Sequence, residues 1–193
     1  MNAEQVAALR TLLAPTGWLD RAAEFARAMR GSVRTQGGLL LVGTPEEEPW
    51  HFAAHLDDES RFAGLPELAP TLVRWDPPPG APPHLNVSLA RLGDAGRGDS
   101  LVVVSPQAAP DRLLERVCDA RKGGATILAL DRGDRRLADM AHEELTVAPT
   151  APLTFDAAQH LDSAAAGTRV EKPRRLRARL ARLLDTVSGP VSP

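Results

Sequence analysis

The sequence predicts an α/β protein built on a parallel β-sheet that helices cover on both faces. Five short apolar runs recur along the chain with helical patterns between most of them, at residues 39–42, 71–75, 101–104, 126–130 and 145–147. Each run is apolar at nearly every position, which is typical of strands buried on both faces of a parallel sheet. The chain has 193 residues and is 43% hydrophobic, which suits one domain with appendages and a core of ordinary size.

Two helices are predicted before the first strand. Apolar residues recur at near-helical spacing over residues 3–13. Pro15 and Gly17 interrupt the pattern, and a second helix is predicted over residues 18–34. The apolar faces of these helices could either contact another subunit or cover the core of their own.

Proline and glycine set the limits of the later elements. Pro110 and Asp111 suit a helix start, because a fixed φ and a negative charge are both favourable there. Gly123-Gly124 suits the end of that helix. Residues 76–83, DPPPGAPP, are predicted to form a surface loop, since prolines lack the backbone donor that a helix or central strand needs.

The carboxyl-terminal part of the chain differs from the rest. Residues 171–185 carry six basic and two acidic side chains, a net charge of +4. Because the whole chain has a formal net charge of −2, the remainder of the chain carries −6. Leucines at helical spacing predict a basic amphipathic helix there. Its basic face either is solvated or binds an acidic protein surface through Arg174, Arg175, Arg177, Arg179 and Arg182. One short basic helix without aromatic residues is weak evidence for nucleic acid or membrane binding.

Composition excludes several classes of protein. Cys118 is the only cysteine, so an internal disulfide is impossible and a reducing cytoplasm is expected. No run approaches the ~20 apolar residues that a membrane span needs, and the first residues lack the pattern of a signal peptide.

The turn after the first strand is the most informative local feature. A strand, a turn and a helix start form the usual place for a phosphate in α/β proteins. Here residues 44–49 read TPEEEP, in which prolines remove backbone donors and carboxylates repel an anion. Each like-charge contact at ~4 Å costs roughly 1 kcal/mol in water. The glutamates at 46–48 are expected to stabilise the start of the following helix, in preference to binding a metal.

These residues resemble a known family. GGLLLVG at 37–43, followed by HFAAHL at 51–56, resembles the first half of sugar isomerase (SIS) domains of the phosphoheptose isomerase type. The similarity continues in order through residues 92–105 and 109–149 and ends with FDAAQHL at 155–161.

The resemblance implies a flavodoxin-like three-layer α-β-α sandwich. It also implies a dimer or tetramer that binds phosphosugars between subunits, with the leading helices packed across the interface. The chain then divides into amino-terminal helices at 1–35, an SIS-like domain at 36–168, and a basic helix with a disordered tail at 169–193.

The resemblance also implies a set of site residues. Gly43 and Thr44 correspond to the first phosphate loop, Ser105 is what remains of the serine loop, and Asp156 and Gln159 lie on the closing helix. His51 matches a family histidine, His55 stands where the family has its glutamate, and His160 comes near the site if the register slips by one residue. Ala164 occupies a second histidine position and cannot transfer a proton.

The sequence therefore predicts a pseudo-isomerase: a non-catalytic SIS-domain protein that acts as an oligomeric scaffold or regulatory binding protein in the cytoplasm. No cofactor or metal is expected, since two histidines four residues apart are a weak metal signal. One alternative is a sugar or phosphosugar isomerase or binding protein with altered site chemistry. Another is a module that binds partners through residues 171–187.

Overall fold

The computed structural model describes residues 11, 13–151 and 153–167. The predicted helix at 3–13 lies almost wholly outside the described residues, as do the predicted basic helix and its arginines, Arg174, Arg175, Arg177, Arg179 and Arg182. None of the helices in the described part of the chain is both long and apolar enough to cross a membrane.

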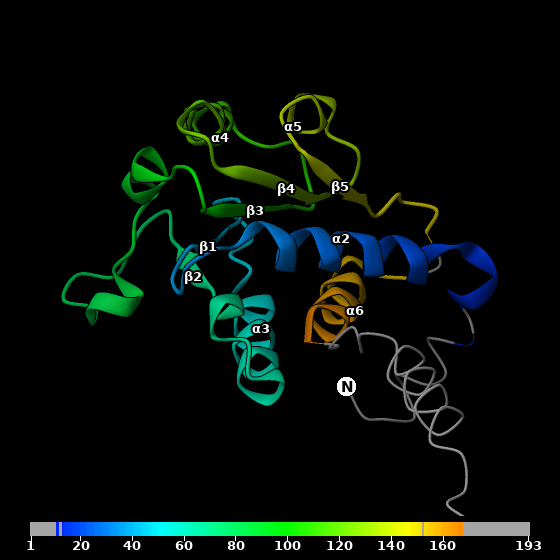
Figure 1. Ribbon diagram of the computed structural model, residues 1–193. Helices are drawn as coiled ribbons and strands as arrows, with labels where there is room; N and C mark the ends of the chain where they lie inside the picture. The colour runs from blue at the N-terminus through cyan, green and yellow to red at the C-terminus, as the bar shows by residue number, and fades with distance from the viewer. Residues whose placement is uncertain (1–10, 12, 152, 168–193) are drawn as a thin grey trace, which may run out of the picture.

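Five parallel strands form a single sheet (Figure 1). They are β1 (Leu39–Val42), β2 (Thr71–Val73), β3 (Ser100–Ser105), β4 (Thr126–Asp131) and β5 (Glu143–Thr146), and their spatial order is β2-β1-β3-β4-β5. All five predicted strands are confirmed. This order is flavodoxin-like, and it reverses between β1 and β3, which is where open α/β sheets leave a crevice at the carboxyl ends of the strands.

Helices cover both faces of the sheet and complete a three-layer sandwich (Figure 1). One layer contains α2 (Trp18–Ser32), α3 (Trp50–Ala63) and α6 (Phe155–Gly167), and the other contains α4 (Asp111–Gly123) and the short α5 (Arg135–Ala138). The predicted limits of α4 are confirmed, because Pro110 precedes its first turn and Gly124 ends it with φ +98°. Residues 76–82 contain no helix or strand, in agreement with the predicted loop at 76–83, whereas Pro83 begins the short 3-10 helix η3 (Pro83–Leu85).

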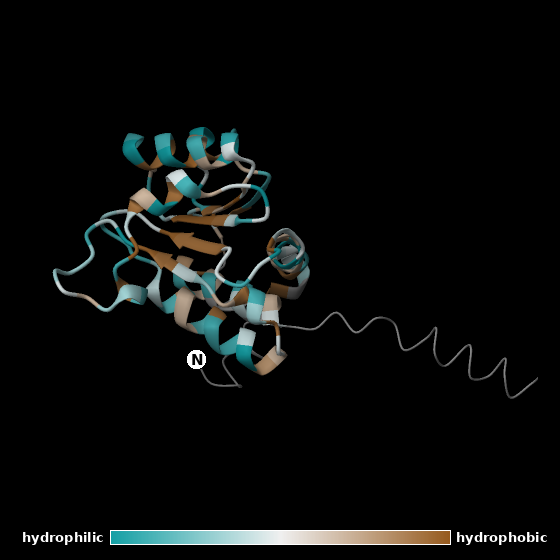
Figure 2. Cartoon of the chain, turned by 60° about the vertical axis from the view of Figure 1, so that its left-hand side comes forward, coloured by the Kyte–Doolittle hydropathy of each residue, from teal (hydrophilic) through white to brown (hydrophobic). Residues whose placement is uncertain are grey.

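The strands supply two apolar cores, one on each face. Leu39 and Leu41 of β1 pack toward α2, α3 and α6, whereas Leu40 and Val42 pack toward α4. Because side chains alternate along a strand, a run that is apolar at every position serves both cores. Figure 2 shows the strands as the most uniformly hydrophobic part of the chain.

The apolar face of α2 is used inside its own subunit. Ala22, Ala26 and Met29 are buried in the core that α2 shares with α6 and the sheet. These residues of α2 therefore cover the core of their own subunit. Contacts of the leading helices with another subunit stay a prediction.

Candidate functional site

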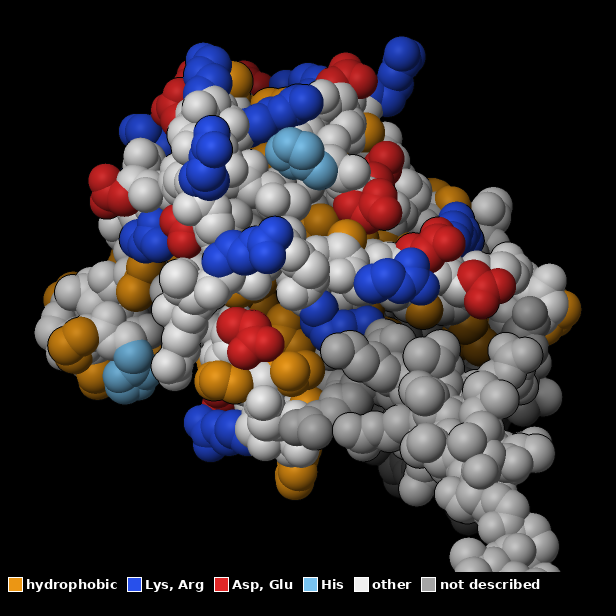
Figure 3. Space-filling view, in the orientation of Figure 1, with side chains coloured by type: hydrophobic (Ala, Val, Ile, Leu, Met, Phe, Trp, Pro, Cys, Tyr) orange, Lys and Arg blue, Asp and Glu red, His pale blue; other side chains and the backbone are white. Residues whose placement is uncertain are grey.

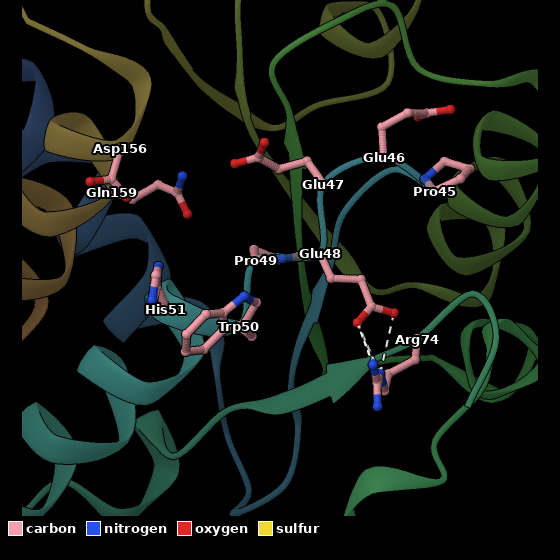
Figure 4. Close-up of a pocket in the computed structure, with 10 residues that line it drawn as sticks. All are labelled: Pro45, Glu46, Glu47, Glu48, Pro49, Trp50, His51, Arg74, Asp156 and Gln159. Atoms are coloured by element: carbon pink, nitrogen blue, oxygen red, sulfur yellow. Dashed lines mark hydrogen bonds and ion pairs between the residues drawn. The ribbon is translucent and has the colours of Figure 1, made fainter. Parts of the chain in front are cut away.

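A hollow of about 530 Å³ opens at the carboxyl ends of β1 and β2, next to the point where the strand order reverses. We call it the cleft. Its lining comes from the turn after β1, the start of α3, the end of β2 and the first turns of α6 (Figure 4). These residues are Pro45, Glu46, Glu47, Glu48, Pro49, Trp50, His51, Arg74, Asp156 and Gln159.

The turn after β1 is closed by its own hydrogen bonds. The backbone N–H of Thr44 donates to the Glu47 carbonyl at 3.1 Å, and the Glu47 N–H donates to the Thr44 carbonyl and to Thr44 Oγ1, both at 3.2 Å. Pro45 and Pro49 have no N–H to offer. A Cβ at Gly43 would overlap the Glu47 carbonyl oxygen and lie 2.6 Å from Pro49 Cδ. Glycine therefore permits the tight turn, and the turn uses donors that a phosphate loop would present to an anion.

The three glutamates precede α3 and do not lie in its first turn, which contains no acidic residue. They directly precede its N-cap, Pro49, and their expected stabilisation of the helix start stays a prediction. Glu48 binds the guanidinium of Arg74, whose Nη2 donates to Oε2 at 2.7 Å and whose Nε donates to the same oxygen at 3.0 Å. The hydrogen bond that Arg74 donates to Glu48 raises the pKa of Arg74.

The lining of the cleft is predominantly acidic. Four carboxylates line it, and Arg74, the one arginine among the described lining residues, is already paired with one of them. In Figure 4 the side chain of Glu47 extends toward Asp156 and Gln159, whereas that of Glu46 points away. A phosphate in this hollow would face several carboxylates, and the arginine of the lining is already paired with one of them.

The opposite wall of the cleft brings together residues that are far apart in the sequence. His51 of α3 points toward Asp156 and Gln159 of α6 (Figure 4), and α3 packs against α6. Gln159 is buried, whereas His51 is exposed and its ring lies 3.5 Å from that of Trp50, centroid to centroid. Three of the predicted site residues therefore share this hollow.

The remaining predicted residues lie elsewhere. Gly43 and Thr44 are buried behind the turn. Ser105 is buried at the end of β3, where its hydroxyl donates to the Gln107 carbonyl at 2.7 Å. His55 is half-buried on α3 beside Glu59. Burial raises the pKa of Glu59, and the nearby His55 opposes this shift.

His160 lies within α6, but its side chain is outside the described part of the structure.

A buried carboxyl group at the neighbouring strand ends was missed by the sequence reasoning. Asp131 ends β4, directly opposite Ser105 of β3, and its Oδ1 accepts a hydrogen bond from the Gly133 N–H at 2.8 Å. Burial raises the pKa of Asp131 to about 6, and the nearby carboxylates of Glu144 and Asp134 add to that shift. An acidic residue directly after an apolar strand was a signal that could have revealed it.

The sequence reasoning also missed Arg74, although a lone arginine at the end of the apolar run TLVRW marks it. It missed Asp162 of α6 as well, whose two carboxyl oxygens are buried without a hydrogen-bond partner. Burial raises the pKa of Asp162 well above its usual value, against the opposing charge of Arg30. Nothing in the local pattern of α6 distinguishes this carboxyl group from an exposed one.

Comparison with known proteins gives similarity in structure alone. No protein-family model matches the sequence, and the search of curated proteins finds no match. The Vibrio vulnificus NanR protein complexed with ManNAc-6P superposes with a TM-score of 0.51 at 12% identity, covering 96% of this chain and 70% of that one.

Two further solved structures are similar. A protein from Salmonella typhimurium LT2 described as sugar-binding gives a TM-score of 0.52 at 17% identity and covers 90% of this chain. A protein from Silicibacter pomeroyi DSS-3 described as a phosphosugar isomerase gives 0.50 at 15% identity and covers 93%. The chain spans 52% and 51% of these two proteins. At such identities the likeness shows the fold alone, which is a flavodoxin-like three-layer α/β sandwich.

Proposed function

We propose that this chain is a non-catalytic SIS-type protein, a regulatory or scaffold protein whose cleft binds a neutral or cationic sugar instead of a phosphosugar. One observation carries the proposal: Arg74 is paired with Glu48, while Glu46, Glu47 and Asp156 also line the cleft. Each carboxylate within ~4 Å of a phosphate costs roughly 1 kcal/mol in water and more in a partly buried site.

The same lining suits hydroxyl and amino groups. Carboxylates accept hydrogen bonds from sugar hydroxyls, and an ammonium group would form a charge-assisted bond of roughly twice the strength of a neutral one. Trp50, whose side chain is 57% exposed at the rim, offers an apolar ring face to a sugar. The volume of about 530 Å³ lies within the range of small-molecule sites.

The state of the turn supports a binding role over a catalytic one. Proton transfer between sugar carbons requires the substrate to be held in register with an acid and a base. A phosphosugar would be held by a phosphate loop, but the N–H groups of Thr44 and Glu47 are used within the turn. This turn therefore does not offer the two N–H groups as an anchor that would position a phosphosugar in the cleft for chemistry.

Calorimetric titration with glucosamine, glucose and glucose 6-phosphate tests the proposal, because the three differ mainly in charge. We expect glucosamine to bind most tightly and the phosphate ester most weakly. In the double variant Glu46→Gln/Glu47→Gln the preference for glucosamine should shrink. Tightest binding of glucose 6-phosphate to the unmodified chain would contradict the proposal.

The second candidate is an isomerase with altered chemistry. It is favoured by the positions of His51 and Asp156, which line the same hollow from α3 and α6 and could act as base and acid. Deuterium exchange at sugar carbon 2, followed by NMR in D₂O, detects such proton abstraction. Exchange that His51→Ala abolishes would support this candidate, and absence of exchange with bound sugar would eliminate it.

We further propose a cytoplasmic homo-oligomer, in which α3 contributes contacts through Phe62, whose side chain is 88% exposed. Phe62→Asp should then lower the mass measured by light scattering, and an unchanged mass would argue against this contact. The segment at 171–187 is proposed to bind an acidic protein surface. Deleting it should abolish capture of an acidic partner in a pull-down while the thermal midpoint of the body stays unchanged.

A further inference from the structure

A second hollow, of about 740 Å³, lies at the opposite, amino-terminal edge of the sheet. Its walls are the end of α2 at residues 28–32, the loop at 34–35 before β1, the loop at 97–98 before β3, and residues 124 and 126 at the start of β4. We call it the basic groove. Figure 3 looks onto this face and shows basic side chains at the carboxyl-terminal end of α2 and around the neighbouring loops.

The charge of the groove is opposite to that of the cleft. Among the described residues that line it, Arg34 and Arg97 are cationic and none is acidic. Within the described part of the chain, neither arginine takes part in a side-chain ion pair or hydrogen bond. Asp99 is the neighbouring carboxylate in the chain, and it already accepts from the Gly96 N–H at 3.1 Å and from Arg91 at 3.5 Å.

Two glycines lie beside the arginines. Gly98 and Gly124 both have φ +98°, a conformation that other residues rarely adopt. The position of a Cβ on Gly98 lies 3.5 Å from Arg34 Cβ, and that on Gly124 lies 3.6 Å from Arg97 Cβ. The Arg34 N–H also donates to the Gly98 carbonyl at 3.2 Å, which ties the two loops together. The bases of both arginine side chains thus lie beside the same groove.

Hydroxyl groups complete the lining. Ser32, Thr35 and Thr126 each contribute a hydroxyl-bearing side chain. The Ser32 hydroxyl already donates to the Met29 carbonyl at 3.1 Å and accepts from Ser100 Oγ at 2.7 Å. The hydroxyls that can donate to a ligand in the groove are therefore those of Thr35 and Thr126. Arginine forks and hydroxyls together are the groups that bind phosphate oxygens.

We propose that the basic groove binds the phosphate group of a small phosphorylated molecule. The carboxyl-terminal dipole of α2 opposes an anion with only about half an elementary charge, whereas two guanidinium groups supply two full charges. The volume suits a ligand of mononucleotide size. The site lies at the other edge of the sheet from the cleft and is independent of the proposed sugar binding.

Calorimetry on the full chain tests the proposal with inorganic pyrophosphate as the probe. Arg34→Ala/Arg97→Ala should weaken binding at least tenfold. The matched control Arg61→Ala/Arg116→Ala removes two exposed arginines elsewhere and should leave the affinity within twofold.

Gly31→Glu provides a test that does not depend on removing a side chain. Nothing lies within 4 Å of a Cβ at this helical position, so the variant should fold with an unchanged or higher thermal midpoint. Its carboxylate at the groove should nevertheless weaken pyrophosphate binding at least tenfold.

Equal affinity in Arg34→Ala/Arg97→Ala, or an equal loss in the control, would overturn the proposal. Failure of the unmodified chain to bind pyrophosphate would overturn it as well. Binding of a single-stranded oligonucleotide that pyrophosphate cannot displace would also overturn it, because that result indicates an extended nucleic-acid surface. Glu46→Gln/Glu47→Gln should leave pyrophosphate binding unchanged, so this test and the sugar titration fail independently.

Discussion

The guanidinium of Arg74 donates two hydrogen bonds to the same carboxylate oxygen of Glu48, Oε2, from Nε at 3.0 Å and from Nη2 at 2.7 Å. The pair joins the turn that precedes α3 to the end of β2. Both side chains are about a fifth exposed, at 22% and 23%, so the pair is reached by solvent and its net contribution to stability is modest. Its larger consequence is electrostatic, because it neutralises a cation that would otherwise attract anions to the cleft.

Glu48→Gln should therefore change ligand preference more than it changes stability. Removing the carboxylate leaves Arg74 charged and free to bind an anion, so the affinity for glucose 6-phosphate should rise severalfold. The free energy of unfolding should fall by about 1 kcal/mol or less, the range of solvent-reached ion pairs. Titration and urea unfolding measure the two effects, and an unchanged or weaker affinity for the phosphate ester would contradict this role of the pair.

Gly43→Ala should destabilise the protein by about 1–3 kcal/mol, the usual cost of forcing extra volume into a packed site. The added Cβ would overlap the Glu47 carbonyl and press on Pro49. Gly31→Ala is the matched control, because its Cβ meets open space on α2 and should stabilise the helix by about 0.5–1 kcal/mol. Urea unfolding measures both variants, and equal stability of the two would show that the turn is not tightly closed.

Asp131 should make the free energy of unfolding fall as the pH rises, which is opposite to the usual effect of an aspartate. Because burial raises the pKa of its carboxyl in the folded state to about 6 from 3.8, the folded state holds a proton that the unfolded state releases. The stabilisation is complete below pH 3.8 and is lost as the pH rises through 6. The loss amounts to at most about 3 kcal/mol, since one pKa unit corresponds to ~1.4 kcal/mol.

Asp131→Asn should remove this dependence while still accepting from the Gly133 N–H. The variant should gain stability over the unmodified chain between pH 4 and pH 7, and the gain should then level off. Urea unfolding over this range, with the exposed Asp76→Asn as control, provides the measurement. A difference between the two proteins that stays constant with pH would show that Asp131 ionises normally.

Asp162 should keep its proton to a higher pH than an exposed aspartic acid. Burial raises the pKa of this carboxyl well above its usual value, and neither oxygen has a hydrogen-bond partner. Infrared difference spectra over a pH series should show a carboxylic-acid C=O band that persists above the pH at which exposed aspartic acids ionise and that is missing in Asp162→Asn. If the band disappears at the same pH as for exposed carboxyl groups, the charge of Arg30 offsets the effect of burial.

The strands could be predicted from the sequence, whereas the site could be predicted only in part. Runs such as residues 101–104 identify strands because apolar side chains at successive positions require burial on both faces. Asp156, Gln159 and His51 were predicted together, and the structure brings them into one cleft. Arg74 was not predicted, because its role depends on a partner 26 positions away in the chain.

The sequence by itself determined the elements, their parallel arrangement and the acidic, proline-bounded turn at residues 44–49, since local periodicity and backbone chemistry set these features. Only the tertiary structure decided which charges meet. Parallel strands bring their carboxyl ends to one edge and their amino ends to the other. This places Arg74 beside Glu48 in the cleft and gathers Arg34 and Arg97 at the opposite groove, because side chains distant along the chain become neighbours only through the register of the sheet.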